Sequence, residues 1–149
     1  MKSLLQAPVL EEMLQRIQQL SPNSKALWGK MTVAQMLLHC TEAMKMSTGE
    51  LKLKRKLFSR LYAPLLNPLY YSKLPFPKGL LTDKGLAVKE QKDFYIEHQR
   101  LLNYLQQYNI QQSTQSEGAV HPFLGYMTAQ QWGIGMYKHL DHHLRQFGV

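Results

Sequence analysis

Two short motifs each place a threonine three residues before a glutamine, directly ahead of a stretch with helical spacing. In the first motif Thr32 is followed by Gln35, and in the second Thr128 is followed by Gln131. This pairing is typical of a capping box, in which the hydroxyl and the amide each satisfy a backbone N–H that the first helical turn leaves unpaired. The sequence therefore predicts that one helix begins after Thr32 and another after Thr128.

Apolar residues repeat at intervals of three and four over four stretches, which is the period of one face of an α-helix. These stretches cover residues 8–20, 32–48, 88–108 and 128–147, and a loop is expected over 111–118. No stretch shows the alternation of a half-buried strand, so strands are not needed. With 149 residues, of which 44% are apolar, the chain can bury one core. We expect an all-α fold, a four-helix bundle, in a single domain spanning the whole chain, 1–149.

Positive charge is concentrated between the second and third predicted helices. The chain has 18 Lys and Arg against 10 Asp and Glu, a net charge of +8. Residues 51–84 hold eight of the basic residues and one acid, so that this segment carries +7 and the remainder is nearly neutral. Its four prolines predict one or two short helices broken at prolines, followed by an extended run. We therefore expect a basic, proline-broken insert between helices 2 and 3.

Several roles suit this basic insert. We prefer the interpretation that the apolar residues of 57–72 cover the bundle or form a dimer face, with the cations reaching outward. Recruitment of an anionic ligand is the next alternative. Binding to nucleic acid or to a membrane surface is not favoured, and the sequence contains no helix-turn-helix, RNP-type aromatic motif or zinc finger.

Other classes of protein are excluded by simple counts. A single cysteine, Cys40, rules out a disulfide framework and a cysteine-rich zinc site, and its place on an apolar stripe predicts a small core residue. No run of about 18 apolar residues exists, so no transmembrane segment is expected. The apolar stretch near the N-terminus is too short for a secretory signal. We therefore expect a cytoplasmic protein.

The histidines are the most informative residues of the sequence. His139 and His143 are four apart on the apolar face of the last helix, a spacing that lets two imidazoles reach one metal ion. A third ligand must come from another helix. His39 lies seven residues after its helix cap, and the other two lie 11 and 15 after theirs, so the offsets differ by one helical turn. His98, central on the third helix face, is the rival third ligand.

A histidine on a helix face is also often a hydrogen-bonded core residue, so spacing alone leaves the metal interpretation open. His121, just before a proline, sits in the loop leading into the last helix and could line the mouth of a site. Glu42 follows His39 by about one turn and is a candidate general base, although a solvated helix acid is the preferred interpretation. The candidate rim residues are thus His121, His98 and Glu42, and no catalytic residue is assigned.

Two longer motifs contain the histidines and the capping boxes. They are Trp28-Gly29-Lys30-Met31-Thr32 through Gln35-Met36-Leu37-Leu38-His39-Cys40, and His121-Pro122-Phe123-Leu124-Gly125 through Thr128, Trp132 and His139-Leu140-Asp141-His142-His143-Leu144-Arg145-Gln146-Phe147-Gly148. With these motifs the chain resembles, over nearly its whole length, the DinB/YfiT-like superfamily of four-helix metalloproteins, and in particular a bacterial subgroup known as a domain of unknown function. The resemblance implies a metal held by His39 from the second helix and by His139 and His143 from the fourth. It also implies a homodimer, and some relatives transfer low-molecular-weight thiols or isomerise thiol adducts.

Three neutral histidines with open coordination positions suit a catalytic metal rather than a closed structural one. Zinc and nickel are the divalent transition metals that we expect on imidazole ligands. Such a metal lowers the pKa of bound water, activates a thiolate or polarises a carbonyl. The first hypothesis is therefore a metal-dependent enzyme of the hydrolase or thiol-transferase type with a small-molecule substrate. The alternative is a non-enzymatic helical domain that binds a small ligand or a partner.

Overall fold

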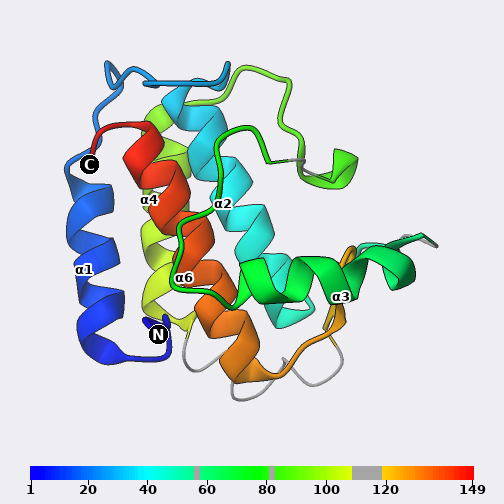
Figure 1. The fold of residues 1–149 in the computed structure, drawn as a ribbon. Helices are drawn as coiled ribbons and strands as arrows, with labels where there is room; N and C mark the ends of the chain where they lie inside the picture. The colour runs from blue at the N-terminus through cyan, green and yellow to red at the C-terminus, as the bar shows by residue number, and fades with distance from the viewer. Residues whose placement is uncertain (56–57, 81–82, 109–118) are drawn as a thin grey trace.

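Four long helices form a bundle in the computed structural model, which describes residues 1–55, 58–80, 83–108 and 119–149 (Figure 1). Helix α2 packs against α4 and α6, and α1 packs against the same two helices, so each helix has two neighbours. This arrangement confirms the predicted all-α four-helix bundle. The helices are α1 (Ala7–Gln18), α2 (Val33–Thr48), α4 (Phe94–Gln106) and α6 (Ala129–Gln146).

Both predicted capping boxes are present. The Thr32 hydroxyl accepts from the Gln35 backbone N–H at 3.2 Å, and the Gln35 amide oxygen accepts from the Thr32 N–H at 2.9 Å. Thr128 and Gln131 repeat the pattern at 3.2 and 2.8 Å. Gly49 ends α2 with a φ of +81°, a left-handed conformation that glycine adopts without steric cost. The predicted starts of α2 and α6, after Thr32 and Thr128, are thus confirmed.

Helix α4 begins later than predicted, at Phe94 instead of Val88. The Asp93 carboxylate accepts from the Ile96 backbone N–H at 3.0 Å and caps the helix at this point. The apolar period alone did not reveal this cap, because an aspartate at an N-cap leaves the spacing of the following residues unchanged. The predicted loop over 111–118 lies outside the described residues.

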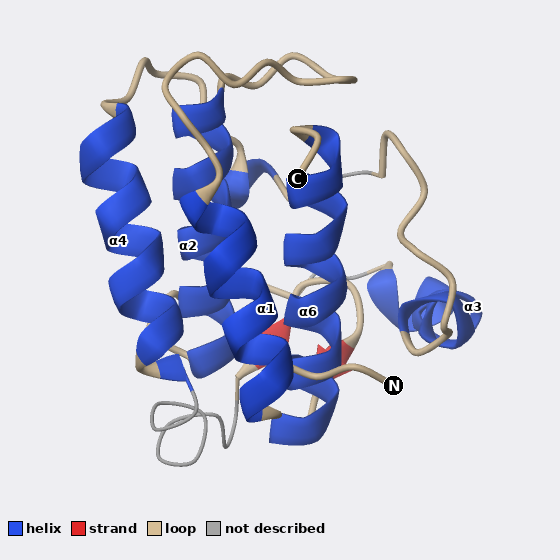
Figure 2. Cartoon of the chain, turned by 90° about the vertical axis from the view of Figure 1, so that its left-hand side faces the viewer, coloured by secondary structure: helices blue, strands red, loops and turns tan. Residues whose placement is uncertain are grey.

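The segment between α2 and α4 contains α3 (Ser59–Tyr70) and a short 3₁₀ helix, η1 (Lys84–Leu86). Helix α3 lies outside the bundle and runs across it (Figures 1 and 2). It is continuous through Pro64 and Pro68, so the prediction that these prolines break the helix was wrong. Both prolines are exposed, which allows water to solvate the carbonyls whose N–H partners they remove.

A two-stranded antiparallel hairpin precedes α6, where no strand was expected. It pairs β1 (Val120–His121) with β2 (Gly125–Tyr126), and His121 lies opposite Gly125. Each strand has only two residues, which is too short to produce an alternating apolar pattern. Within the part of the chain that the structure describes, no helix combines the length and the apolar composition needed to cross a bilayer.

The core is one hydrophobic cluster shared by the four bundle helices. Cys40 belongs to it and is fully buried, and burial raises the pKa of its thiol, as expected for a small core residue. The polar site described next is built against this cluster. The largest fully buried side chains of the bundle helices are Met13, Ile17, Met36, Leu37, Met44, Leu101, Leu105, Trp132, Leu140 and Leu144.

Candidate metal centre

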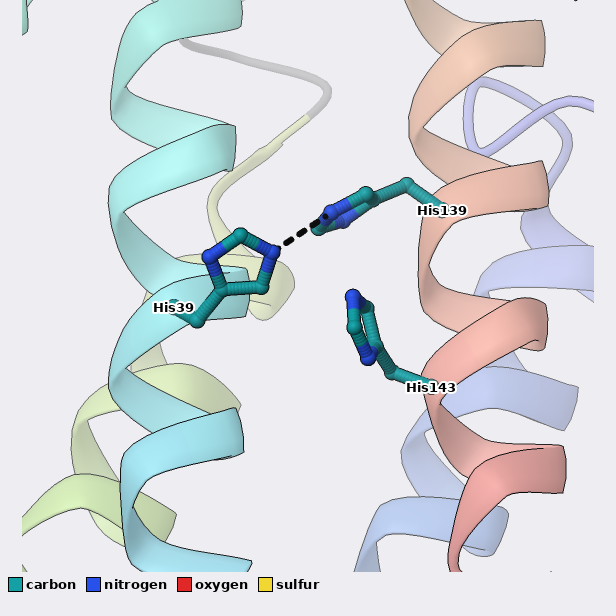
Figure 3. Close-up of side chains that lie close together, drawn as sticks. All are labelled: His39, His139 and His143. Carbon is teal, nitrogen blue, oxygen red and sulfur yellow. Dashed lines mark hydrogen bonds between the residues drawn. The ribbon is translucent and has the colours of Figure 1, made fainter. Parts of the chain in front are cut away.

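Three histidine side chains converge between two helices. His39 comes from α2, and His139 and His143 come from successive turns of α6 (Figure 3). Each offers a ring nitrogen, and these nitrogens all lie within 4.8 Å of one another. The ring centroids are 4.7–4.9 Å apart. The structure therefore brings together the three histidines that the sequence analysis singled out, at a separation that one ion can bridge.

His39 is held in one tautomer by the backbone of η1. Its Nδ1 lies 2.9 Å from the carbonyl oxygen of Leu86. Because a carbonyl oxygen can only accept, Nδ1 donates, and Nε2 of the neutral ring keeps its lone pair. That lone pair points toward the other two histidines (Figure 3).

His143 is held in the same way by a glutamine one turn later. Its Nδ1 lies 2.8 Å from Oε1 of Gln146. The Gln146 amide donates from Nε2 to the Trp28 carbonyl at 2.6 Å, which fixes the side of the amide that faces the histidine. A Cβ at Gly29 would approach Nε2 of Gln146 to 2.6 Å, so the glycine leaves room for this contact. The loop before α2 thus braces the second ligand through Gln146.

His139 differs from the other two ligands. Its Nε2 lies 3.0 Å from Nε2 of His39, while its Nδ1 is buried without a hydrogen-bond partner among the described residues. Two lone pairs at this separation repel, so a proton or a cation must lie between the two Nε2 atoms. Since His39 presents a lone pair there, Nε2 of the neutral His139 ring carries the proton. This arrangement fits a metal site with one ligand that lacks an orienting partner.

Burial keeps all three rings neutral. It lowers the pKa of His143 to about 3, lowers the pKa of His39, and lowers the pKa of His139 well below its usual value. Repulsion between the clustered imidazolium charges lowers the pKa values of His139 and His143 further. At neutral pH Nε2 of His39 and Nε2 of His143 therefore offer lone pairs, and neutral His139 becomes a ligand through Nε2 only if its proton moves to Nδ1.

The other candidate residues lie outside this three-histidine group. Nε2 of His98 is hydrogen-bonded to the Ile17 carbonyl at 3.0 Å, and its ring stacks on Phe94, so it joins α4 to α1. Glu42 accepts from Lys45 at 3.1 Å as a half-buried ion pair on α2. The structure thus brings His39, not His98, together with the two histidines of α6.

His121 lies in β1, next to the N-terminal half of α6. Its ring centroid is 5.6 Å from that of Trp132. Its Nδ1 accepts from the backbone N–H groups of Phe123 and Leu124, at 3.2 and 3.1 Å. His121 is thus held firmly by its own hairpin, although it is not one of the three grouped histidines.

The groups that orient the histidines were not predicted from the sequence. Gln146 follows His143 by three residues, so a hydrogen bond along one helix face was available as a signal. The Leu86 and Trp28 carbonyls are backbone atoms, and no residue type marks them. Only the fold shows that these two loops reach the site.

The chain matches the model of the family described as "Protein of unknown function (DUF1569)" over residues 1–148. Comparisons with curated proteins and with solved structures found no match. The expected resemblance to a group of unknown function is thereby confirmed at the level of this family. Because the match spans nearly the whole sequence, the chain belongs to the DUF1569 family.

Proposed function

We propose that the protein binds one divalent transition metal ion, zinc or nickel, through His39, His139 and His143, and acts as a metal-dependent enzyme on a small molecule. One observation carries this proposal: two buried rings are locked in the tautomer that directs Nε2 toward the third ring, so the site is organised for a cation before one binds. If these histidines were only hydrogen-bonded core residues, three neutral rings would not need to direct nitrogen atoms to within 4.8 Å of one another.

The three histidines and the two groups that orient them have different roles in this proposal. The Leu86 carbonyl and the Gln146 amide hold two ligand rings and make them more basic. Three neutral protein ligands leave coordination positions for a substrate, and they leave the charge of the ion uncompensated. When bound, the metal supplies Lewis acid chemistry, lowering the pKa of a bound water or thiol or polarising a carbonyl.

The reaction class that we propose is hydrolysis or thiol transfer. Among the described residues no carboxylate joins the three-histidine group, and Glu42, the nearest candidate in sequence, is paired with Lys45. This composition suits a nucleophile that ionises readily without a carboxylate base, as a thiol does. Thiol transfer is therefore the first reaction to assay, with ester and amide hydrolysis next.

Metal analysis of protein purified without a histidine tag or a chelator tests the proposal. We expect about one zinc or nickel ion per chain, and loss of that ion in His139→Ala and His143→Ala. His98→Ala is the matched control, because it removes an imidazole outside the site. A folded wild-type protein that contains no metal and takes up neither ion would refute the proposal, and would favour a non-enzymatic ligand-binding domain.

A further inference from the structure

Beside the N-terminal half of α6 gather three polar side chains whose N–H or O–H groups have no hydrogen-bond acceptor among the described residues. Tyr70 ends α3, His121 lies in β1, and Trp132 lies in the first turn of α6. The His121 ring lies next to both of the others, with centroid separations of 5.6 Å to Tyr70 and 5.6 Å to Trp132. We call these three residues the donor cluster, because each presents an N–H or O–H group.

Trp132 is the most deeply buried member of the donor cluster. Its side chain is 0% exposed, and no described residue accepts a hydrogen bond from its indole Nε1–H. The indole can only donate. A buried donor without a partner is costly, typically about 1–3 kcal/mol, so it is a position where a ligand or a water is expected to supply the acceptor.

His121 is also fixed as a donor. Because its Nδ1 accepts from the backbone N–H groups of Phe123 and Leu124, the neutral ring carries its proton on Nε2. Burial lowers the pKa of His121 to about 4 against the opposing effect of the Asp83 carboxylate, so the ring is neutral near pH 7. Within the described part of the chain, no group accepts from Nε2.

Tyr70 is held against α6 from two sides. Lys138 donates to the Tyr70 carbonyl at 3.0 Å, which anchors the end of α3. The Tyr70 hydroxyl occupies the space that a side chain at Gly135 would fill. Burial raises the pKa of Tyr70, so the hydroxyl keeps its proton and can donate it.

The donor cluster adjoins the three-histidine site. Gly135, which contacts the Tyr70 hydroxyl, precedes His139 by one helical turn and lies on the same face of α6. Trp132 precedes His139 by seven residues, so a molecule that reaches from Trp132 to the three-histidine site needs to span about two turns of helix, on the order of 10 Å.

We propose that Tyr70, His121 and Trp132 bind a carboxylate of the substrate, whose reacting end lies at the three-histidine site. The second half of this proposal rests on the proposed metal-dependent function, and the first half does not. Three neutral donors suit the lone pairs of a carboxylate. A phosphate dianion would require a cation, and the nearby Lys138 is hydrogen-bonded to the carbonyls of Tyr70 and Ser72. The net charge of +8 favours the approach of anions.

Nuclear magnetic resonance of the two tryptophan indoles tests the donor cluster directly. The chain has two tryptophans, and both have a buried Nε1–H without a partner in the described residues. The Trp28 ring contacts His142 and Lys78 and not the donor cluster, so Trp28 is an internal control for the role of the cluster. On titration with sodium benzoate, we expect the Trp132 indole signal to shift saturably and the Trp28 signal to stay in place. Inorganic phosphate, titrated separately, is expected to bind more weakly.

Tyr70→Phe removes one hydroxyl and keeps the ring. We expect it to weaken benzoate binding about tenfold, the effect of losing a hydrogen bond to a charged group. Tyr95→Phe, at a side chain that is exposed and outside the cluster, is expected to leave the affinity unchanged. Equal affinities of wild type and Tyr70→Phe would overturn the role of Tyr70. An unshifted Trp132 signal in wild-type protein would overturn the whole cluster, whatever the variant does.

The titration is carried out on metal-free and on zinc-loaded protein, so that the two proposals can fail separately. If zinc does not bind but benzoate shifts the Trp132 signal, the donor cluster stands and the metal proposal fails. If zinc binds and benzoate produces no shift at Trp132, the metal site stands and the donor cluster is rejected.

Discussion

The two halves of α6 differ in how their polar groups are satisfied. In the C-terminal half, His143 is bonded to Gln146, and Gln146 is bonded in turn to the loop before α2. In the N-terminal half, the indole Nε1–H of Trp132 is buried without a partner among the described residues, whereas Nδ1 of His139, in the C-terminal half, is the one unpartnered atom of the three-histidine group. A fully hydrogen-bonded network holds its atoms in place, and a buried donor without a partner is a position where a ligand or a water can supply the acceptor. This comparison underlies the two proposals, a metal ion at the C-terminal half and a carboxylate beside the N-terminal half.

Acid should destabilise both halves, and this is the largest effect that we expect. The pKa values of His143, in one half, and of His121, beside the other, lie at about 3 and about 4 in the folded protein. Below an unfolded pKa of about 6.5, the unfolded chain binds protons that the folded chain cannot, so stability falls as the pH falls. Each histidine then costs about 1.4 kcal/mol per pH unit down to its folded pKa. Urea unfolding of metal-free protein between pH 8 and pH 4 measures this loss, and a flat profile would contradict the burial of these rings.

Removal of the Gln146 amide, which orients His143, should weaken metal binding without removing a ligand. Gln146→Ala leaves His143 in place but takes away the acceptor for its Nδ1–H, and we expect metal affinity to fall about 10- to 100-fold. Competition with a coloured zinc chelator measures the change. Arg145→Ala, at the exposed neighbouring position, is the control and should bind zinc as the wild type does.

A smaller loss of metal affinity is expected from filling the space beside Gln146. Gly29→Ala introduces a Cβ close to Nε2 of Gln146 at a residue with a φ of +82°. Gly79→Ala has the same kind of strain, with a φ of +75°, but no atom lies within 4 Å of the added Cβ. Both variants should lose about 1 kcal/mol of stability. Only Gly29→Ala should also lose metal affinity, and equal affinities in the two variants would show that the loop does not brace the site.

The helix caps should have the smallest effect. Thr128→Ala and Thr32→Ala each remove a cap and should each lower the free energy of unfolding by about 1 kcal/mol. Because Thr128 lies at the end of α6 that carries the donor cluster, its loss should weaken benzoate binding more than zinc binding. Urea unfolding and the two binding assays decide this, and a larger loss of zinc affinity than of benzoate affinity would contradict the division of α6 into two halves.

The parts of the site that could be predicted from the sequence are those that depend on the types and the spacing of side chains along one helix. The threonine caps and the spacing of His139 and His143 were readable because a helix has one period and one direction. The choice of His39 over His98 was left open by the residues themselves, since it depends on which helix packs beside α6. The packing of α2 against α6 brings His39 to the site.

The parts that could not be predicted belong to the backbone of segments distant in sequence. The groups of Leu86 and Trp28 that act at the site are backbone carbonyls. Every residue type has a backbone carbonyl, so only the fold reveals that these two lie at the site. Helix α3 was also read incorrectly, because its exposed prolines are tolerated at positions where water replaces the lost bonds. As a result the position of Tyr70, at the end of that helix, was not foreseen.

X-ray absorption of the zinc-loaded, untagged protein identifies the ligands of the metal. We expect a first shell with three imidazole nitrogens, one of which is lost in His39→Ala and none in His98→Ala. A shell with fewer than three imidazoles, or the same shell in wild type and in His39→Ala, would contradict the assignment of His39, His139 and His143 as the metal ligands.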